Sequence, residues 1–191
     1  MFDACFLGAR AFLHATGDFG EKDAFQKPIV TISVPWSNAL PCNYHFKDLA
    51  KIIAEEVERL GGKPFIHGTP VVADGEVQNT AGMKYSLVSR DLIADCIELM
   101  HDAYRADLLI TIGGCDKSLP GTLMPLARGN HIGLTMYGGS ASNGNLGCGQ
   151  PTLPGMVAPA DKLNAGSPYE AVGAYYAGDM DEDMVLAVEV P

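Results

Sequence analysis

The chain has 191 residues, 47% of them hydrophobic and 19% charged, and its formal net charge is −10 at pH 7. This length suits one domain with a sizeable core or at most two small ones, and the composition is globular rather than disordered. The negative charge disfavours nucleic acid and anionic membrane surfaces as partners, and no apolar run reaches the roughly 18 residues of a membrane span. Because residues 1–10 lack a signal-peptide or transit-peptide pattern, we expect a cytosolic protein, or an organellar one already trimmed.

Strand and helix patterns alternate along the first half of the chain, after a start at 1–27 with little periodicity. The β-branched, uncharged run 28–34 predicts a buried strand, and the proline- and asparagine-rich segment 35–43 predicts a loop. Apolar residues then recur at three- and four-residue steps over 44–60, which predicts a helix that stops at the glycine pair 61–62.

The second half repeats this alternation. A short extended segment at 64–72 and a polar, glycine-rich loop at 73–83 lead into a helix that begins near Ser86 or Ser89, two suitable N-caps. The apolar run 107–112 predicts another buried strand. The remaining predictions are a loop at 113–121, a helix at 122–128, a strand at 132–137, a loop-rich region at 144–166, and helices at 168–177 and 181–190.

This order of elements predicts an α/β fold in which helices flank a parallel sheet. Ligands of such sheets bind beyond the carboxyl ends of the strands. The loops that carry Cys42 and Cys115 both fall at that edge, although 73 positions separate them (115 − 42).

The run Gly113-Gly114-Cys115-Asp116-Lys117 places a thiol, a carboxylate and an amine side by side after a strand. A thiolate suits an iron–sulfur cluster or zinc, and a carboxylate suits Mg²⁺. A partly buried lysine loses its proton more easily, which permits Schiff-base or carbamate chemistry. The alternative, which spacing alone favours, is a tight strand–helix turn in which Asp116 caps the helix and Lys117 is solvated.

The remaining cysteines and one acidic residue can each be interpreted in two ways. Cys42 precedes a helix, whose N-terminus favours thiolate, but it also fits a half-buried structural role. Asp74 precedes a glycine in a polar loop, a pattern more typical of a turn than of a ligand. Cys96 lies on an apolar helix stripe and is predicted to be a core residue, Cys148 is a candidate third ligand in a flexible loop, and Cys5 is uninformative. The odd number and wide spacing of the cysteines argue against a disulfide framework.

Three histidines, His45, His67 and His131, lie at the edges of predicted elements. None has a metal-type partner at helical spacing, so we predict surface or capping roles for them. The segment 138–140 (GGS) follows a strand and is a weak candidate for anion binding.

Four stretches together resemble the dihydroxy-acid dehydratase family in both order and spacing, over about residues 27–178. They are Pro41-Cys42-Asn43-Tyr44-His45, Asp74-Gly75, the run GMKYSLVSRDLIAD from Gly82 to Asp95, and Gly114-Cys115-Asp116-Lys117-Ser118-Leu119-Pro120-Gly121. The last of these, Gly-Cys-Asp-Lys-x-x-Pro-Gly, is highly specific.

The resemblance implies roles for five residues. Cys42 and Cys115 would be thiolate ligands of an iron–sulfur cluster, either 2Fe–2S or 4Fe–4S. Asp74 and Asp116 would bind Mg²⁺, and Lys117 would act in catalysis as a carbamylated Mg²⁺ ligand. The implied reaction removes water from a small 2,3-dihydroxy acid to give a 2-oxo acid in branched-chain amino-acid biosynthesis, with a homodimer as the full-length assembly.

The resemblance also implies that residues 1–191 are an incomplete N-terminal domain. In the family, a third cluster cysteine, a serine base and a barrel-like second domain lie further along the chain, so we expect this polypeptide to be inactive alone and to expose an apolar face that favours association. The segment 76–79 (EVQN) departs from the family pattern. The alternatives are therefore a sugar-acid (aldonic acid) dehydratase of the same superfamily, a truncated non-catalytic metal-binding or partner subunit, and a thiol-nucleophile enzyme that uses Cys115.

Overall fold

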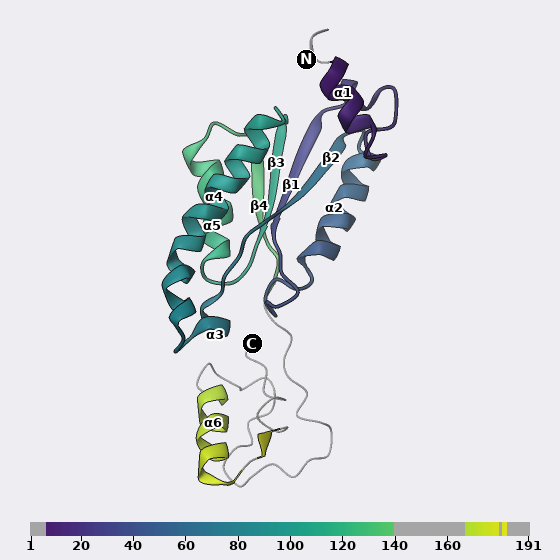
Figure 1. Cartoon of the computed structure of the whole chain (residues 1–191). Coiled ribbons are helices and arrows are strands. Elements are labelled where there is room, and N and C mark those ends of the chain that lie inside the picture. Colours follow the sequence, from purple (N-terminus) through teal and green to yellow (C-terminus); the bar gives the residue numbers. More distant parts are fainter. Residues whose placement is uncertain (1–6, 140–166, 180, 183–191) are drawn as a thin grey trace. The chain divides into compact units, whose positions relative to one another are not determined.

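The computed structural model describes residues 7–139, 167–179 and 181–182 and divides the chain into two compact units, Met1–Gly138 and Gly139–Pro191. The first unit contains a four-stranded parallel sheet with the strand order β2-β1-β3-β4 (Figure 1). Its strands are β1 Ile29–Pro35, β2 Lys63–Thr69, β3 Leu108–Gly113 and β4 Gly133–Tyr137. This confirms the predicted α/β class.

Helices cover both faces of the sheet. On one face lies α2, and on the other lie α4 and α5, which pack against each other (Figure 1). Their bounds are α2 Phe46–Arg59, α4 Ser86–Ala103 and α5 Ser118–Arg128. Shorter elements connect or precede them, namely α1 Leu7–His14, η2 Ala24–Gln26, α3 Asp74–Val77 and η3 Ala81–Tyr85. The second unit contains α6 Ser167–Ala177.

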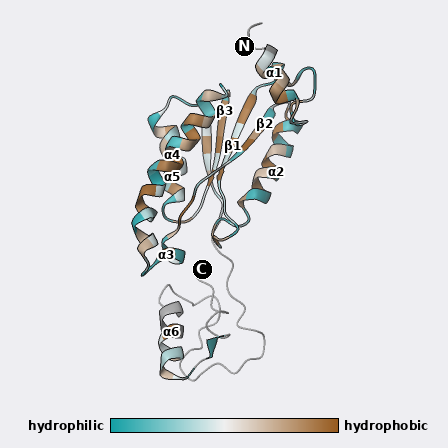
Figure 2. Ribbon diagram, in the orientation of Figure 1, coloured by the Kyte–Doolittle hydropathy of each residue, from teal (hydrophilic) through white to brown (hydrophobic). Residues whose placement is uncertain are grey.

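The core is centred on β1, which is buried along its whole length and presents alternate residues to the two helix layers. Apolar side chains of β1 and β3 pack against Phe46, Ala50 and Val57 on the apolar face of α2. On the other side, Ile93 and Ile97 of α4 pack against Leu109 of β3. Figure 2 shows the apolar strands between helices that carry both polar and apolar residues. A parallel sheet covered on both faces requires such uncharged central strands.

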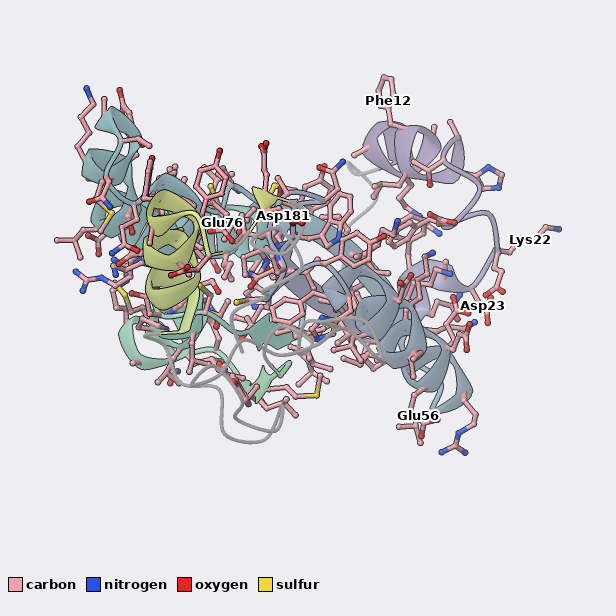
Figure 3. All side chains as sticks on the ribbon, turned by 90° about the horizontal axis from the view of Figure 1, so that it is seen from below. Phe12, Lys22, Asp23, Glu56, Glu76 and Asp181 are labelled. Atoms are coloured by element: carbon pink, nitrogen blue, oxygen red, sulfur yellow. The ribbon has the colours of Figure 1, made fainter. Side chains whose placement is uncertain are left out.

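The outer surface carries both charged and apolar side chains. Glu56 on the outer side of α2 forms an exposed ion pair with Arg59, and Figure 3 shows it pointing away from the sheet. Exposed apolar side chains lie on several elements, among them Leu99 on α4 and Leu134 on β4. Phe12 projects from α1 with 81% of its surface exposed (Figure 3). Among the described helices, none is long and apolar enough to cross a membrane.

The element boundaries differ from the sequence-based predictions in places. The third helix begins at Ser118 rather than 122, because Pro120 sits in the first helical turn, where a missing backbone N–H costs nothing. The segment 64–72 is a full strand at Lys63–Thr69, since its backbone pairs with β1. The predicted loop 73–83 contains two short helices, and the start at 1–27 contains α1 and η2.

Towards the end of the chain, α6 confirms the predicted helix at 168–177. The predicted loop 144–166 and most of the predicted helix 181–190 lie outside the described residues.

We expect Gly121→Ala to destabilise the sheet unit. An added Cβ would lie 2.8 Å from the Arg90 carbonyl oxygen and 3.1 Å from Ile93, so α4 and α5 would have to separate. Overpacking of this kind costs about 1–3 kcal/mol, measurable by urea unfolding. The control is Gly8→Ala, which meets nothing within 4 Å and should leave stability unchanged or slightly higher. Equal stability of the two variants would contradict the close packing of α4 on α5.

Candidate metal centre

All five predicted site residues lie at the carboxyl edge of the sheet, in segments that follow three of its strands. Cys42 follows β1, Asp74 follows β2, and Cys115, Asp116 and Lys117 follow β3. These three strands are neighbours in the sheet order, so their loops emerge side by side. The sheet topology therefore gathers residues that the sequence keeps far apart, as expected for an α/β fold.

A lysine and two carboxylates form the polar half of this edge. Lys117 Nζ lies 3.0 Å from Asp74 Oδ2 and also donates to Asp116 Oδ2. The Lys117 side chain is 17% exposed, whereas those of Asp74 and Asp116 are 33% and 53% exposed. Hydrogen bonds to Asp116 and then to Asp74 raise the pKa of Lys117, which is therefore an ammonium ion here. One positive charge thus lies between two negative ones. The carboxylates leave a net negative charge, and their oxygen atoms suit a hard cation such as Mg²⁺.

Ser86 fixes one of these carboxylates. Its side chain is almost fully buried at the first residue of α4, and its hydroxyl donates to Asp74 Oδ1. This hydrogen bond, followed by those from Lys117, lowers the pKa of Asp74. The sequence predicts Ser86 only as a helix cap, so its role at the site was missed. No sequence pattern links Ser86 to Asp74, which lies twelve residues earlier. Whether the two side chains meet depends on how the segment between them folds.

Two half-buried thiols form the other half of the edge. Cys115 has a φ of +53°, a left-handed conformation that is uncommon and strained for a residue with a Cβ. Burial raises the pKa of Cys115 to about 12, and the neighbouring Cys42 thiol adds to the shift. Cys115 Sγ also lies 3.7 Å from Asp116 Oδ1. A cation that binds here must displace the thiol proton, because the thiolate is the ligand form.

A buried asparagine ties the two cysteine loops together. Asn43 is fully buried, and its Nδ2 donates to the Pro35 carbonyl oxygen at 2.6 Å and to Ser118 Oγ at 3.3 Å. Ser118 in turn donates to the Gly114 carbonyl oxygen, next to Cys115. Asn43 Oδ1 is buried and has no hydrogen-bond partner among the described residues. No sequence pattern predicts a role for Asn43, although its amide is one of the few side-chain groups that can bridge two loops in this way.

Two glycines and a histidine make close contacts at the same edge of the sheet. A Cβ at Gly113 would clash with Thr122 Oγ1, and one at Gly138 would clash with the Phe46 ring. His45 Nε2 donates to the Gly138 carbonyl oxygen at 2.6 Å, which attaches the end of β4 to the loop after β1. The predicted surface or capping role is wrong for His67, which is only 8% exposed because it lies inside β2.

The remaining cysteines do not join this group in the described structure. Cys96 is half-buried on α4, in partial agreement with its predicted core role. Cys5, Cys148 and Ser140 lie outside the described residues.

The fold and the site define a class of protein. It is a parallel α/β domain that places two thiols and a group of carboxylate oxygens at the carboxyl ends of its strands. A sequence model of the family described as dihydroxy-acid/6-phosphogluconate dehydratase N-terminal matches residues 27–190. The chain belongs to this family.

Curated relatives point to the same family. The chain is 43% identical over 180 residues to a dihydroxy-acid dehydratase of Pyrobaculum calidifontis, 42% to one of Prochlorococcus marinus and 41% to one of Crocosphaera subtropica. Each match covers 94% of this chain but only 29–30% of the relative. The chain therefore spans less than a third of the length of these relatives.

We expect Asn43→Ala to loosen the loops that hold the two site cysteines. The substitution removes both hydrogen bonds from Nδ2 and leaves buried acceptors unpaired, at a cost of about 1–3 kcal/mol. Alkylation of Cys42 and Cys115 by iodoacetamide, located by peptide mass mapping, should become faster. Asn38→Ala, an exposed position in the same loop, is the control and should change neither the stability nor the alkylation rates. Unchanged alkylation rates in Asn43→Ala would contradict the role of Asn43 in joining the loops.

The lowered pKa of Asp74 predicts a pH-dependent stability. A carboxyl group whose pKa is lower in the folded state stabilises the fold at pH values above its unfolded pKa of about 4, and this stabilisation disappears as the pH falls through the folded value. Because a third of the side chain is exposed, we expect no more than about 1 kcal/mol. Asp74→Asn should flatten the acid limb of a plot of unfolding free energy against pH. The exposed Asp91→Asn should leave that limb as it is.

Proposed function

We propose that this chain is the cluster- and Mg²⁺-binding part of a hydro-lyase that converts a 2,3-dihydroxy acid to a 2-oxo acid. The observation that carries the proposal is the meeting of Cys42 and Cys115 with Asp74, Asp116 and Lys117 at one sheet edge, in a chain of this family. The relatives named dihydroxy-acid dehydratase support the reaction type.

The two thiols suit an iron–sulfur cluster. Cys42 and Cys115 come from adjacent loops, are half-buried, and are close enough for Cys42 to contribute to the raised pKa of Cys115. Thiolates are the usual ligands of such clusters, which take about four of them, so further ligands must come from other residues. We assign Cys42 and Cys115 as two cluster ligands. Cysteine thiolates hold both 2Fe–2S and 4Fe–4S clusters, so these two ligands suit either type.

The oxygen-rich half suits Mg²⁺. Asp74 and Asp116 supply carboxylate oxygens, and the Lys117 ammonium occupies the position between them. Addition of carbon dioxide to the neutral amine of Lys117, with loss of one proton, would give a carbamate. Lys117 would then change from a competing cation into a third oxygen ligand. Mg²⁺ would take over the neutralising role of the ammonium ion.

The ions and the protein divide the chemistry between them. When bound, the iron–sulfur cluster supplies a Lewis acid for the leaving C3 hydroxyl, and Mg²⁺ stabilises negative charge at the substrate carboxylate and C2 oxygen. The protein's part is to hold the ligands in place: Ser86 keeps Asp74 ionised, and Asn43 fixes the separation of the cysteine loops. The bound cations also allow a chain of net charge −10 to receive an acidic substrate.

A sugar-acid dehydratase is the second candidate. The segment 76–79 (EVQN), which departs from the family pattern, begins within α3, two residues after Asp74. Its last residue, Asn79, has a φ of +59°, so the segment turns sharply beside the proposed Mg²⁺ ligands. The family description itself includes 6-phosphogluconate dehydratase. A changed loop beside the proposed Mg²⁺ ligands fits a different substrate preference, such as a sugar acid.

A thiol-nucleophile enzyme and a non-catalytic partner subunit are less well supported. A nucleophilic role for Cys115 conflicts with its raised pKa, because little thiolate exists at neutral pH. A non-catalytic subunit would retain the same ligands but show no turnover, so an activity assay separates it from an enzyme.

The test uses the full-length protein prepared without oxygen. We expect iron and sulfide to bind in wild type and to fall at least about tenfold in Cys42→Ser and Cys115→Ser, whereas Cys96→Ser retains them. Turnover of 2,3-dihydroxyisovalerate, followed by release of 2-oxo acid, should need both iron and Mg²⁺. Asp116→Asn should keep the iron but lower activity by about a hundredfold or more, because it removes a metal ligand.

Each contrary outcome has a specific meaning. Turnover of aldonic acids alone would select the sugar-acid candidate. Iron binding that survives both cysteine substitutions would refute the assigned cluster ligands. Iron binding without any turnover would favour the non-catalytic subunit.

A further inference from the structure

A second group of metal-type ligands lies at the opposite edge of the sheet. His101 and Asp102 occupy the last turn of α4, shortly before β3 begins, and His131 lies just before β4. The two strands are parallel neighbours, with Leu109 paired to Gly133, so the segments that lead into them lie side by side. This is the amino-terminal edge of the strands, whereas the cysteines and carboxylates of the proposed dehydratase site belong to the carboxyl-terminal edge.

The three side chains converge. One potential ligand atom from each lies within 4.8 Å of the others. The two imidazole rings meet edge to face, with centroids 4.6 Å apart and an interplanar angle of 76°, and His131 Nδ1 is 3.9 Å from Asp102 Oδ1. His101 is 3% exposed and the His131 side chain 14%, whereas the Asp102 side chain is 65% exposed. Two ligands are thus held by packing, and the third is open to solvent.

Thr31 orients the more buried histidine. Its hydroxyl, on the fully buried Thr31 of β1, lies 3.0 Å from His101 Nδ1. When Nδ1 carries the proton and donates to Thr31 Oγ1, Nε2 is left with a free lone pair. Metal-binding histidines are oriented in this way, by a hydrogen bond from the ring nitrogen that does not bind the metal.

We infer that His101, Asp102 and His131 form a binding site for a divalent transition metal, with zinc as the best match. Zinc takes imidazole and carboxylate ligands at about 2.0–2.2 Å in tetrahedral geometry, which places the ligand atoms about 3.4 Å apart. The present spread of up to 4.8 Å must therefore contract by roughly 1.4 Å at most. Rotation of the exposed Asp102 side chain accommodates much of this change. A water molecule or an external ligand completes the fourth position.

This site differs in chemistry and in effect from the proposed Mg²⁺ centre. Two imidazole nitrogens favour zinc, cobalt or nickel over Mg²⁺, which prefers an all-oxygen environment. A bound ion would join the end of α4 to the start of β4, an edge strand whose residues are half-buried or exposed. It would therefore stabilise the edge of the sheet, and it takes no part in the dehydration.

The experiment titrates zinc into the protein in buffer that contains excess Mg²⁺. At zinc about a hundredfold above its dissociation constant, the thermal unfolding midpoint should rise by roughly 5–10 °C. We expect His131→Gln and Asp102→Asn each to weaken zinc binding by at least about tenfold. The matched controls His14→Gln on α1 and Asp91→Asn on α4 should bind zinc like wild type. Because Asp102 is exposed, its substitution tests the site without threatening the fold.

Cobalt distinguishes this site from the cysteines. Co²⁺ bound to two histidines and an aspartate should give weak visible bands without a thiolate charge-transfer band, and the bands should persist in a Cys42→Ser/Cys115→Ser double variant. Loss of the bands in that variant would place the metal at the thiols and overturn the inference. Zinc affinity unchanged in both His131→Gln and Asp102→Asn would overturn it as well. Neither readout depends on dehydratase activity, so failure here is distinct from failure of the proposed function.

Discussion

The Lys117 ammonium between Asp74 and Asp116 is the contact on which the carboxyl edge of the sheet depends. It joins the loop after β2 to the loop after β3 across the end of the central strand β1. Two carboxylates at such close range would repel each other if no cation lay between them. The same arrangement explains why a metal suits the position, because a divalent ion can replace the ammonium charge and use the oxygens already in place.

The thiol half of the edge is arranged by packing and backbone strain rather than by charge. Cys115 adopts a left-handed conformation, and the adjoining Gly113 can hold no Cβ because Thr122 lies against it. The loop therefore has few alternative conformations, and Asn43 fixes its distance from the loop that carries Cys42. Strain of this kind persists only where the surrounding structure enforces it, and such positions cluster at functional sites. The strain falls on Cys115, which we propose as a cluster ligand.

The two ends of one sheet thus carry different ligand chemistry. At the carboxyl ends of the strands, loops supply thiols and carboxylates that are partly open to a substrate. At the amino ends, a helix terminus supplies His101, which is buried against β1, and a strand entrance supplies His131, whose ring packs against that of His101. A metal at the first edge can meet a substrate, whereas a metal at the second mainly joins two elements of the fold.

The sequence by itself determined the fold class and the members of the main site. Uncharged β-branched runs at β1 and β3 and the helical periodicity of α2 predict a covered parallel sheet, and the family resemblance that the Gly-Cys-Asp-Lys run helps to carry implies the site residues that the sheet edge brings together. The tertiary structure alone decided the supporting contacts. Ser86 contacts Asp74 because the segment between them, predicted as a loop, folds into two short helices. Asn43 contacts Ser118, which lies 75 positions further along the chain. His101 and His131 meet only because β3 and β4 are neighbours. Sequence periodicity reports which face of an element is buried, but contacts between elements depend on strand order and helix packing, which no local pattern encodes.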